Sequence, residues 1–233
     1  MLLLDEHAGD EGGLSPIDAR PLCTVRCQVA SRENRLVLST VEVVERLRAL
    51  AEVRVPLWLA GGVAVDFHVG RWTRAHADVD LVAFHRDRGP LAEALSHVGV
   101  LLAQDGAWTT KWSFRGRQPA DIEIVFVEHS QPERASGTLV IPRDDATGAR
   151  AGRYPFVEGY LSLTRWAELD GVRFRVTSAE GEWLNRAKAT GGGVIPGRRA
   201  KPELAHDRRL LEALVSERRR GELLAFLSGR EDR

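Results

Sequence analysis

Cysteine, long apolar stretches and an excess of either charge are what this 233-residue sequence has least of. Its two cysteines, Cys23 and Cys27, have no second pair to complete a zinc site, so we expect two free thiols. No apolar run approaches the roughly 20 residues that a membrane-spanning helix needs. The opening Met-Leu-Leu-Leu is followed by Asp5 and Glu6 and lacks the basic start of a signal peptide. These absences predict a cytoplasmic protein without a membrane anchor.

Charge is balanced, with 33 Lys and Arg residues against 33 Asp and Glu residues. A net charge of zero gives the protein no overall field that would attract a nucleic acid. The sequence therefore disfavours a nucleic-acid partner, although a local basic stripe could serve one. The partner has to be inferred from a local site.

Apolar patterning divides the chain into four parts. Residues 1–36 hold no sustained apolar period and are expected to form a flexible arm. Residues 37–130 carry helical and strand patterns in turn and are expected to form the core. Residues 131–176 read as an irregular extension with short strands. Residues 177–233 contain amphipathic stretches and predict a small helical subdomain beside the core.

Within the core, each element has a local signal. Ser39 and Glu42 form a capping box that starts a helix, and Gly61-Gly62 opens a second helix that should stop at Gly70. A third helix is expected near Pro90. Strands are expected at residues 57–60, 78–84, 108–114 and 121–127, the last two as a hairpin. The predicted fold class is α+β: a mixed sheet with helices, followed by the helical subdomain.

Two acids stand at the start of the strand DVDLVAF. Asp78 and Asp80 are two residues apart, so on a strand their side chains project from the same face and repel each other. Magnesium prefers carboxylate oxygens and would remove that repulsion. The alternative is a solvated strand face, and the D-x-D pattern alone does not distinguish such a face from a metal site.

The residues before this strand suit a phosphate. Gly61 and Gly62 lie at a predicted helix N-terminus, where free N–H groups and the helix dipole favour an anion. Arg71, Arg74 and His76 follow in the connecting loop and could donate to a polyphosphate, although such residues are also ordinary in loops.

A third acidic strand carries Asp121 and Glu123 on one face. If it lies beside residues 78–84, one of these acids joins the first two at one metal site. Lys188, on a helix that Ser178 can cap, is a further candidate to reach a triphosphate, although a lysine on an amphipathic helix is more often a surface charge. A phosphate cradle, two metal ligands and a third carboxylate together describe nucleotidyl transfer.

The segment VPLWLAGGVAVDFHVGRWTRAHADVDL, residues 55–81, resembles the signature of the small antibiotic nucleotidyltransferases, the aminoglycoside 2″-adenylyltransferase and lincosamide nucleotidyltransferase group of the DNA polymerase β-like superfamily. The resemblance implies that Gly61 and Gly62 begin the phosphate-binding helix. It implies metal ligation by Asp78, Asp80 and Asp121, with Asp121 also as the catalytic base. Glu123 would then face the acceptor, as in the aminoglycoside branch.

This resemblance implies a magnesium-dependent enzyme, with two ions expected, that transfers a nucleoside monophosphate from ATP or another NTP to a small-molecule hydroxyl and releases pyrophosphate. An aminoglycoside- or lincosamide-like antibiotic is the expected acceptor. The alternatives are a metabolite, protein or RNA end as acceptor, or a non-catalytic nucleotide-binding or antitoxin-like module. The N-terminal extension and residues 130–170 have no counterpart in the resemblance.

Overall fold

The computed structural model describes most of the chain after residue 36. The described residues are 37–106, 109–115, 120–128, 138–141, 152–155, 157, 159–190 and 202–231. The predicted arm, both cysteines and Trp108 lie outside them. Residues 35–233 group into one compact unit. No helix in the described part of the chain is long and apolar enough to cross a membrane.

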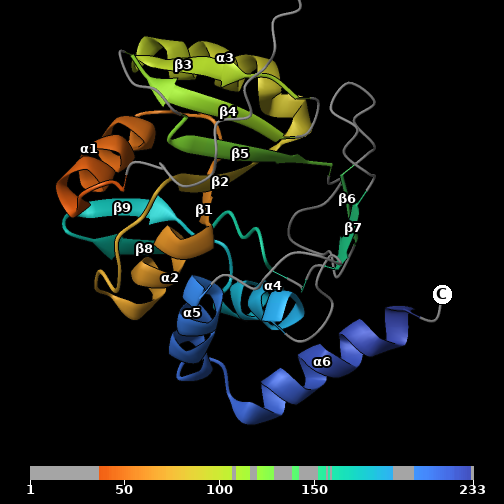
Figure 1. The fold of residues 1–233 in the computed structure, drawn as a ribbon. Coiled ribbons are helices and arrows are strands. Elements are labelled where there is room, and N and C mark those ends of the chain that lie inside the picture. Colours follow the sequence, from red (N-terminus) through yellow and green to blue (C-terminus); the bar gives the residue numbers. More distant parts are fainter. Residues whose placement is uncertain are drawn as a thin grey trace, which may run out of the picture. The chain divides into compact units, whose positions relative to one another are not determined.

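A five-stranded mixed sheet forms the centre of this unit (Figure 1). Its spatial order is β1 (Trp58–Ala60), β2 (Val79–Phe84), β5 (Ile122–Val127), β4 (Thr109–Phe114) and β3 (Val100–Gln104). Strands β2 and β5 are parallel, and every other neighbouring pair is antiparallel. The strand at 121–127 therefore lies directly beside the strand that follows Asp78, as the site prediction requires.

Three helices belong to the first half of the chain: α1 (Thr40–Ala51), α2 (Gly61–Val69) and α3 (Arg88–His97). The Ser39–Glu42 capping box starts α1, because each residue hydrogen-bonds the other's backbone N–H. Helix α2 ends at Gly70, which has a left-handed φ of 74°. A short 3-10 helix, η2 (His85–Asp87), leads into α3.

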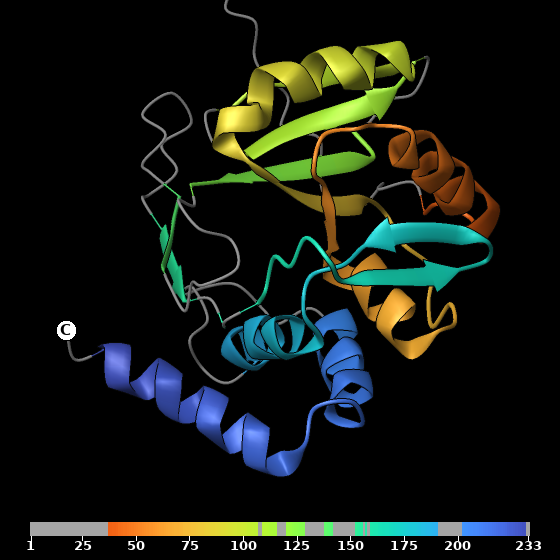
Figure 2. The same ribbon diagram turned by 180° about the vertical axis from the view of Figure 1, so that it is seen from behind.

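Two hairpins and three helices complete the described structure (Figure 2). The hairpins are β6 (Thr138–Ile141) with β7 (Gly152–Pro155), and β8 (Trp166–Leu169) with β9 (Val172–Arg175). The helices are α4 (Ala179–Thr190), α5 (Pro202–Glu212) and α6 (Glu217–Glu231). Figures 1 and 2 place α3 near the β3 end of the sheet and α4–α6 near the β1 end.

The two faces of the sheet pack against different partners. Alternate residues of β2 and β5, such as Leu81 and Ile124, are buried with α1 and α3 in one apolar cluster. The opposite face contributes Val82 and Val127 to a second cluster with Trp183 and other residues of the C-terminal helices. Burial of this second face joins the C-terminal helices to the sheet, and Asp80 and Glu123 belong to the same face.

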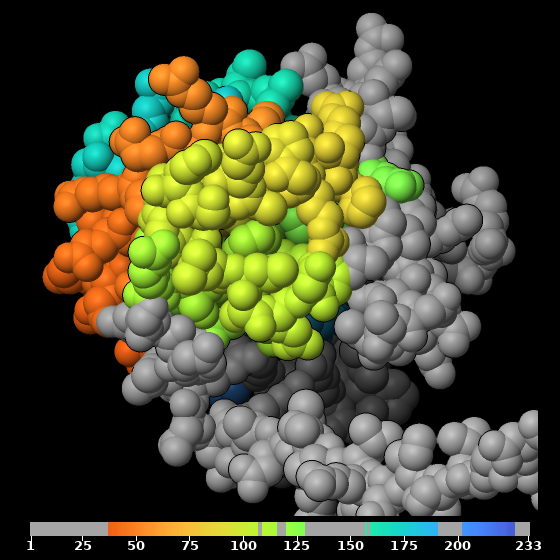
Figure 3. Space-filling model, turned by 90° about the horizontal axis from the view of Figure 1, so that it is seen from above, coloured from red at the N-terminus to blue at the C-terminus, as the bar shows by residue number. Residues whose placement is uncertain are grey.

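The α+β prediction is confirmed, but it omitted one strand of the central sheet. β3 forms the edge of the sheet, and Leu101 and Leu102 remain 42% and 46% exposed. The space-filling view from above shows the residues of α3, β3 and β4 as one continuous surface (Figure 3). Residues 100–104 (VLLAQ) lack the apolar–polar alternation of a half-buried strand and follow α3 after a turn of only two residues, which ends at Gly99.

Candidate active site

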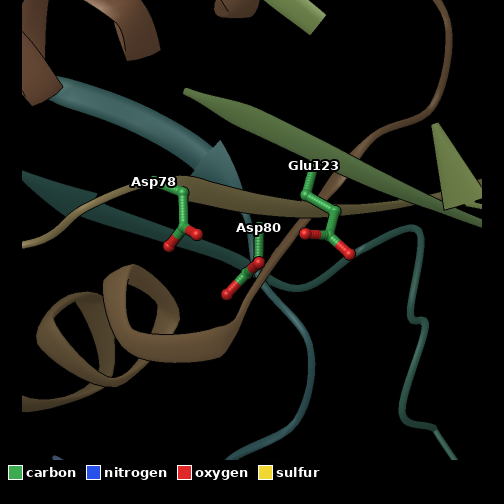
Figure 4. Close-up of side chains that lie close together, drawn as sticks. All are labelled: Asp78, Asp80 and Glu123. Carbon is green, nitrogen blue, oxygen red and sulfur yellow. The ribbon is translucent and has the colours of Figure 1, made fainter. Parts of the chain in front are cut away.

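The structure brings three carboxylates together at the start of β2 and β5. Asp78, Asp80 and Glu123 each offer an oxygen atom, and these atoms lie within 4.8 Å of one another. Asp80 and Glu123 are direct partners in the parallel register of β2 and β5. The three side chains project from the same side of the two strands (Figure 4), and Asp80 lies against Gly61 in the first turn of α2. We call this group the acid cluster.

The acid cluster is electrostatically strained without a cation. Burial raises the pKa of Asp80 from 3.8 to about 7, and the neighbouring charges of Asp78, Glu123 and Glu182 act in the same direction. A cation bound among these oxygens would favour the ionised forms. Three half-buried carboxylates converging from two strands are a donor set that suits magnesium, with water and phosphate oxygens completing the coordination.

The first turn of α2 approaches the acid cluster closely because it begins with two glycines. Gly61 has a φ of 66°, and a Cβ atom there would lie 2.0 Å from Oδ2 of Asp80. A Cβ atom at Gly62 would lie 2.0 Å from Nη2 of Arg74. Ala60, the residue before the helix, makes no side-chain cap, so the N–H groups of the first turn are available to an anion.

The loop after α2 is held by buried acids. Asp66 is completely buried and accepts hydrogen bonds from the backbone and hydroxyl of Thr73; its other oxygen lies 2.6 Å from Nε2 of His76. Arg74 forms a bidentate ion pair with Asp207 of α5. Arg71 is exposed after the helix stop. The structure thus brings Arg74 and His76 to Gly62, while a role for Arg71 in nucleotide binding stays a prediction.

Asp121 does not join the acid cluster, contrary to the sequence expectation. Its Oδ2 accepts a hydrogen bond from Nε of Arg46 on α1, and both side chains are about 5% exposed. Asp121 lies one residue before β5 begins at Ile122, so strand alternation does not fix its direction. Glu123, which was expected to face the acceptor, lies beside the two aspartates instead.

Two buried acids of the C-terminal helices were missed by sequence reasoning. Glu182 accepts hydrogen bonds from the hydroxyls of Tyr160 and Thr177 and pairs with Arg186. Asp207 binds Arg186 and Arg74. The only local signal is the spacing of four residues between Glu182 and Arg186, which is common on solvated helices. Lys188 is half-buried near the end of α4, and its contact with a nucleotide stays a prediction.

Comparison with known proteins places this geometry in a family. The model of the family described as aminoglycoside-2″-adenylyltransferase matches residues 41–184, more than half of the chain. The chain belongs to this family. The matched residues include α2, the acid cluster and the buried Asp66.

Individual proteins match this chain over a shorter stretch. The 2″-aminoglycoside nucleotidyltransferase of Escherichia coli is 38% identical over 60 residues, which are 25% of this chain and 34% of that protein. A Klebsiella pneumoniae protein of the same name matches to the same extent. The chain therefore matches about a third of the length of these relatives.

Two solved structures share the fold of this chain. ANT(2″)-Ia in complex with adenylyl-2″-tobramycin superposes with a TM-score of 0.59 at 19% identity, covering 82% of this chain and 98% of the other. The lincosamide adenylyltransferase LnuA, bound to lincomycin, gives 0.52 at 15% identity, covering 77% and 100%. These likenesses confirm the mixed sheet and its helices as the nucleotidyltransferase fold.

The raised pKa of Asp80 predicts a pH-dependent stability in the metal-free protein. Because the folded state holds this proton up to about pH 7 and the unfolded state releases it near 3.8, stability should fall as the pH rises through this interval. Thermal unfolding midpoints of the wild type and Asp80→Asn, measured in EDTA from pH 4.5 to 8, check this. The wild type should lose more stability than the variant over that range. Parallel pH profiles would contradict the assignment.

Proposed function

We propose that this protein is a magnesium-dependent nucleotidyltransferase. It transfers a nucleoside monophosphate from an NTP, with ATP as the expected donor, to a hydroxyl group of a small molecule. The observation that carries the proposal is the convergence of Asp78, Asp80 and Glu123, with Asp80 against the uncapped first turn of α2. Membership of the adenylyltransferase family supports the same reaction.

Different parts of the site bind the donor nucleotide and the metal. The N–H groups at the start of α2 bind phosphate oxygens, and Gly61 and Gly62 let the side chains of Asp80 and Arg74 lie against this turn. Asp78, Asp80 and Glu123 would hold the magnesium, which would supply positive charge to balance the phosphates. Catalysis then depends mainly on positioning and on stabilising charge in the transition state.

Glu123 is the residue best placed to take the proton from the acceptor. The acceptor oxygen forms a bond to the α-phosphorus while the bond from that phosphorus to the bridging β-phosphate oxygen breaks, and pyrophosphate leaves. The hydroxyl proton passes to the Glu123 carboxylate, which needs only to lie within hydrogen-bond reach. Asp121 cannot serve in this position while Arg46 holds it on the α1 side of the sheet.

We propose an antibiotic hydroxyl as the acceptor. Adenylyl-2″-tobramycin and lincomycin are bound in the structures of two proteins with the same fold. The test is pyrophosphate release from ATP, GTP, CTP and UTP in the presence of aminoglycosides and lincosamides, with magnesium or with EDTA. Turnover with one such acceptor, abolished by EDTA, is expected. Nucleotide binding without turnover across a panel that also includes sugars, nucleosides and RNA ends would contradict the proposal.

Gly62→Ala should weaken ATP binding by about tenfold, which is about 1.4 kcal/mol. The added methyl group would lie 2.0 Å from Nη2 of Arg74 and 3.0 Å from Nδ1 of His76, so it must displace donors at the phosphate site. Calorimetric titration with ATP and magnesium measures the effect. Gly89→Ala is the matched control, because a Cβ atom there meets no atom within 4 Å. Equal ATP affinity in both folded variants would mean that the glycines form only a turn.

A further inference from the structure

Asp207 occupies an unusual position on α5, since one carboxylate serves two arginines from other elements. It is 1% exposed. Nε and Nη2 of Arg74 donate to its two oxygens at 3.0 and 3.2 Å. Nε and Nη2 of Arg186 donate to Oδ2 at 3.3 and 3.2 Å. The carboxylate thus joins the loop after α2 to helix α4.

The charged side chains around Asp207 neutralise one another. Arg186 is 4% exposed and also pairs with Glu182, so two buried acids balance Arg186 and Arg74. Glu182 is itself held by the hydroxyls of Tyr160 and Thr177. A buried carboxylate whose partners are all fixed is a rigid anchor, because moving any partner leaves a buried charge uncompensated.

Arg74 is the most exposed of these four charged residues, and it faces the donor site. It is 23% exposed, and its Nη2 packs directly on Gly62 in the first turn of α2. Asp207 and the carbonyl of Ala75 take three of its five N–H groups. Within the described part of the chain, one N–H on each terminal nitrogen of Arg74 has no acceptor and remains for a ligand. These remaining donors lie where the proposed function places the phosphates.

We propose that Asp207 is a positioning residue of the donor site, which holds Arg74 over the first turn of α2 so that Arg74 donates to the outer phosphates of the nucleotide. The proposal rests on the proposed function. A flexible arginine would lose side-chain entropy on binding a triphosphate, whereas an arginine already held by a bidentate carboxylate loses less. Asp207 lies beyond residues 41–184, so helix α5 adds to the donor site outside the family match.

The test separates this role from a purely structural one. Asp207→Asn should raise the KM and the calorimetric Kd for MgATP by about tenfold. It should leave AMP affinity and kcat at saturating ATP within about threefold of wild type, because AMP lacks the outer phosphates. The matched control is Glu212→Gln on the same helix, which removes the half-exposed ion pair with Arg208 and should leave all of these values unchanged.

A double-mutant cycle shows whether Asp207 acts through Arg74. Arg74→Gln should weaken ATP binding to a similar extent, and adding Asp207→Asn should weaken it no further. If Asp207→Asn does not fold, Asp207→Glu keeps the charge, shifts Arg74 by one methylene and should raise the KM in the same direction.

Unchanged ATP affinity in the folded Asp207 variant, equal losses for ATP and AMP, or additive effects in the cycle would overturn this role. A wild-type protein that binds no MgATP would instead overturn the proposed function.

Discussion

Asp80→Asn is expected to abolish nucleotidyl transfer while leaving the protein folded and, without magnesium, more stable. Asp80 lies between Asp78 and Glu123 in the acid cluster, so its loss removes a ligand that the other two cannot replace. Loss of a catalytic metal ligand should lower kcat by roughly a thousandfold or more. The gain in stability follows because the amide ends the repulsion that raises the pKa of the acid to about 7.

Pyrophosphate release and thermal unfolding in EDTA measure these two effects on the same preparation. Asp78→Asn should behave like Asp80→Asn. Asp87→Asn provides the control, because this acid lies in η2 beyond the far end of β2 and should affect neither measurement. If Asp78→Asn or Asp80→Asn retained more than about a tenth of wild-type turnover, the assignment of the metal site would be wrong.

Glu123→Gln is expected to lower kcat by roughly a hundredfold to ten-thousandfold with a small change in ATP affinity. Gln keeps the size of the side chain but can neither accept the hydroxyl proton nor contribute charge to the acid cluster. The sequence had suggested the opposite distribution, with Asp121 as the base and Glu123 at the acceptor. The prediction changes because Glu123 lies opposite Asp80 in the strand register, whereas Asp121 forms an ion pair with Arg46.

Asp121→Asn should instead lower stability, by about 3–5 kcal/mol, since it leaves Arg46 buried without a counter-charge. Its kcat, corrected for the folded fraction, should stay near wild type. Arg46→Met added to Asp121→Asn should recover part of the stability, because the unpaired charge is then gone. Steady-state kinetics and denaturant unfolding of the three variants check this. A folded Asp121→Asn protein that is inactive, beside an active Glu123→Gln protein, would restore the original assignment.

The elements with strong local signals were predictable from the sequence. The capping box starts α1, Gly70 ends α2, and the two-residue spacing of Asp78 and Asp80 predicted a shared face, which the structure confirms. In each case the interaction joins residues that are close in the chain, so the pattern itself contains the physical cause.

The remaining features depend on contacts between distant residues. Alternation placed Asp121 and Glu123 on one face, but Asp121 precedes the strand and turns toward Arg46, which lies 75 residues away. Asp207 lies 133 residues from Arg74. Neither pairing has a local signature, because an acid on an amphipathic helix has the same pattern whether it meets water or a buried arginine.

The place of β5 between β2 and β4 has a consequence for how the protein folds. β4 pairs with β3 as a hairpin of neighbouring segments, but β2 must wait for a strand that follows about 40 residues later in the chain. Such non-local parallel pairing forms slowly because a long loop must close first. On the ribosome, the acid cluster therefore cannot assemble before β5 has emerged. We expect metal binding to report the completed sheet and not its early intermediates.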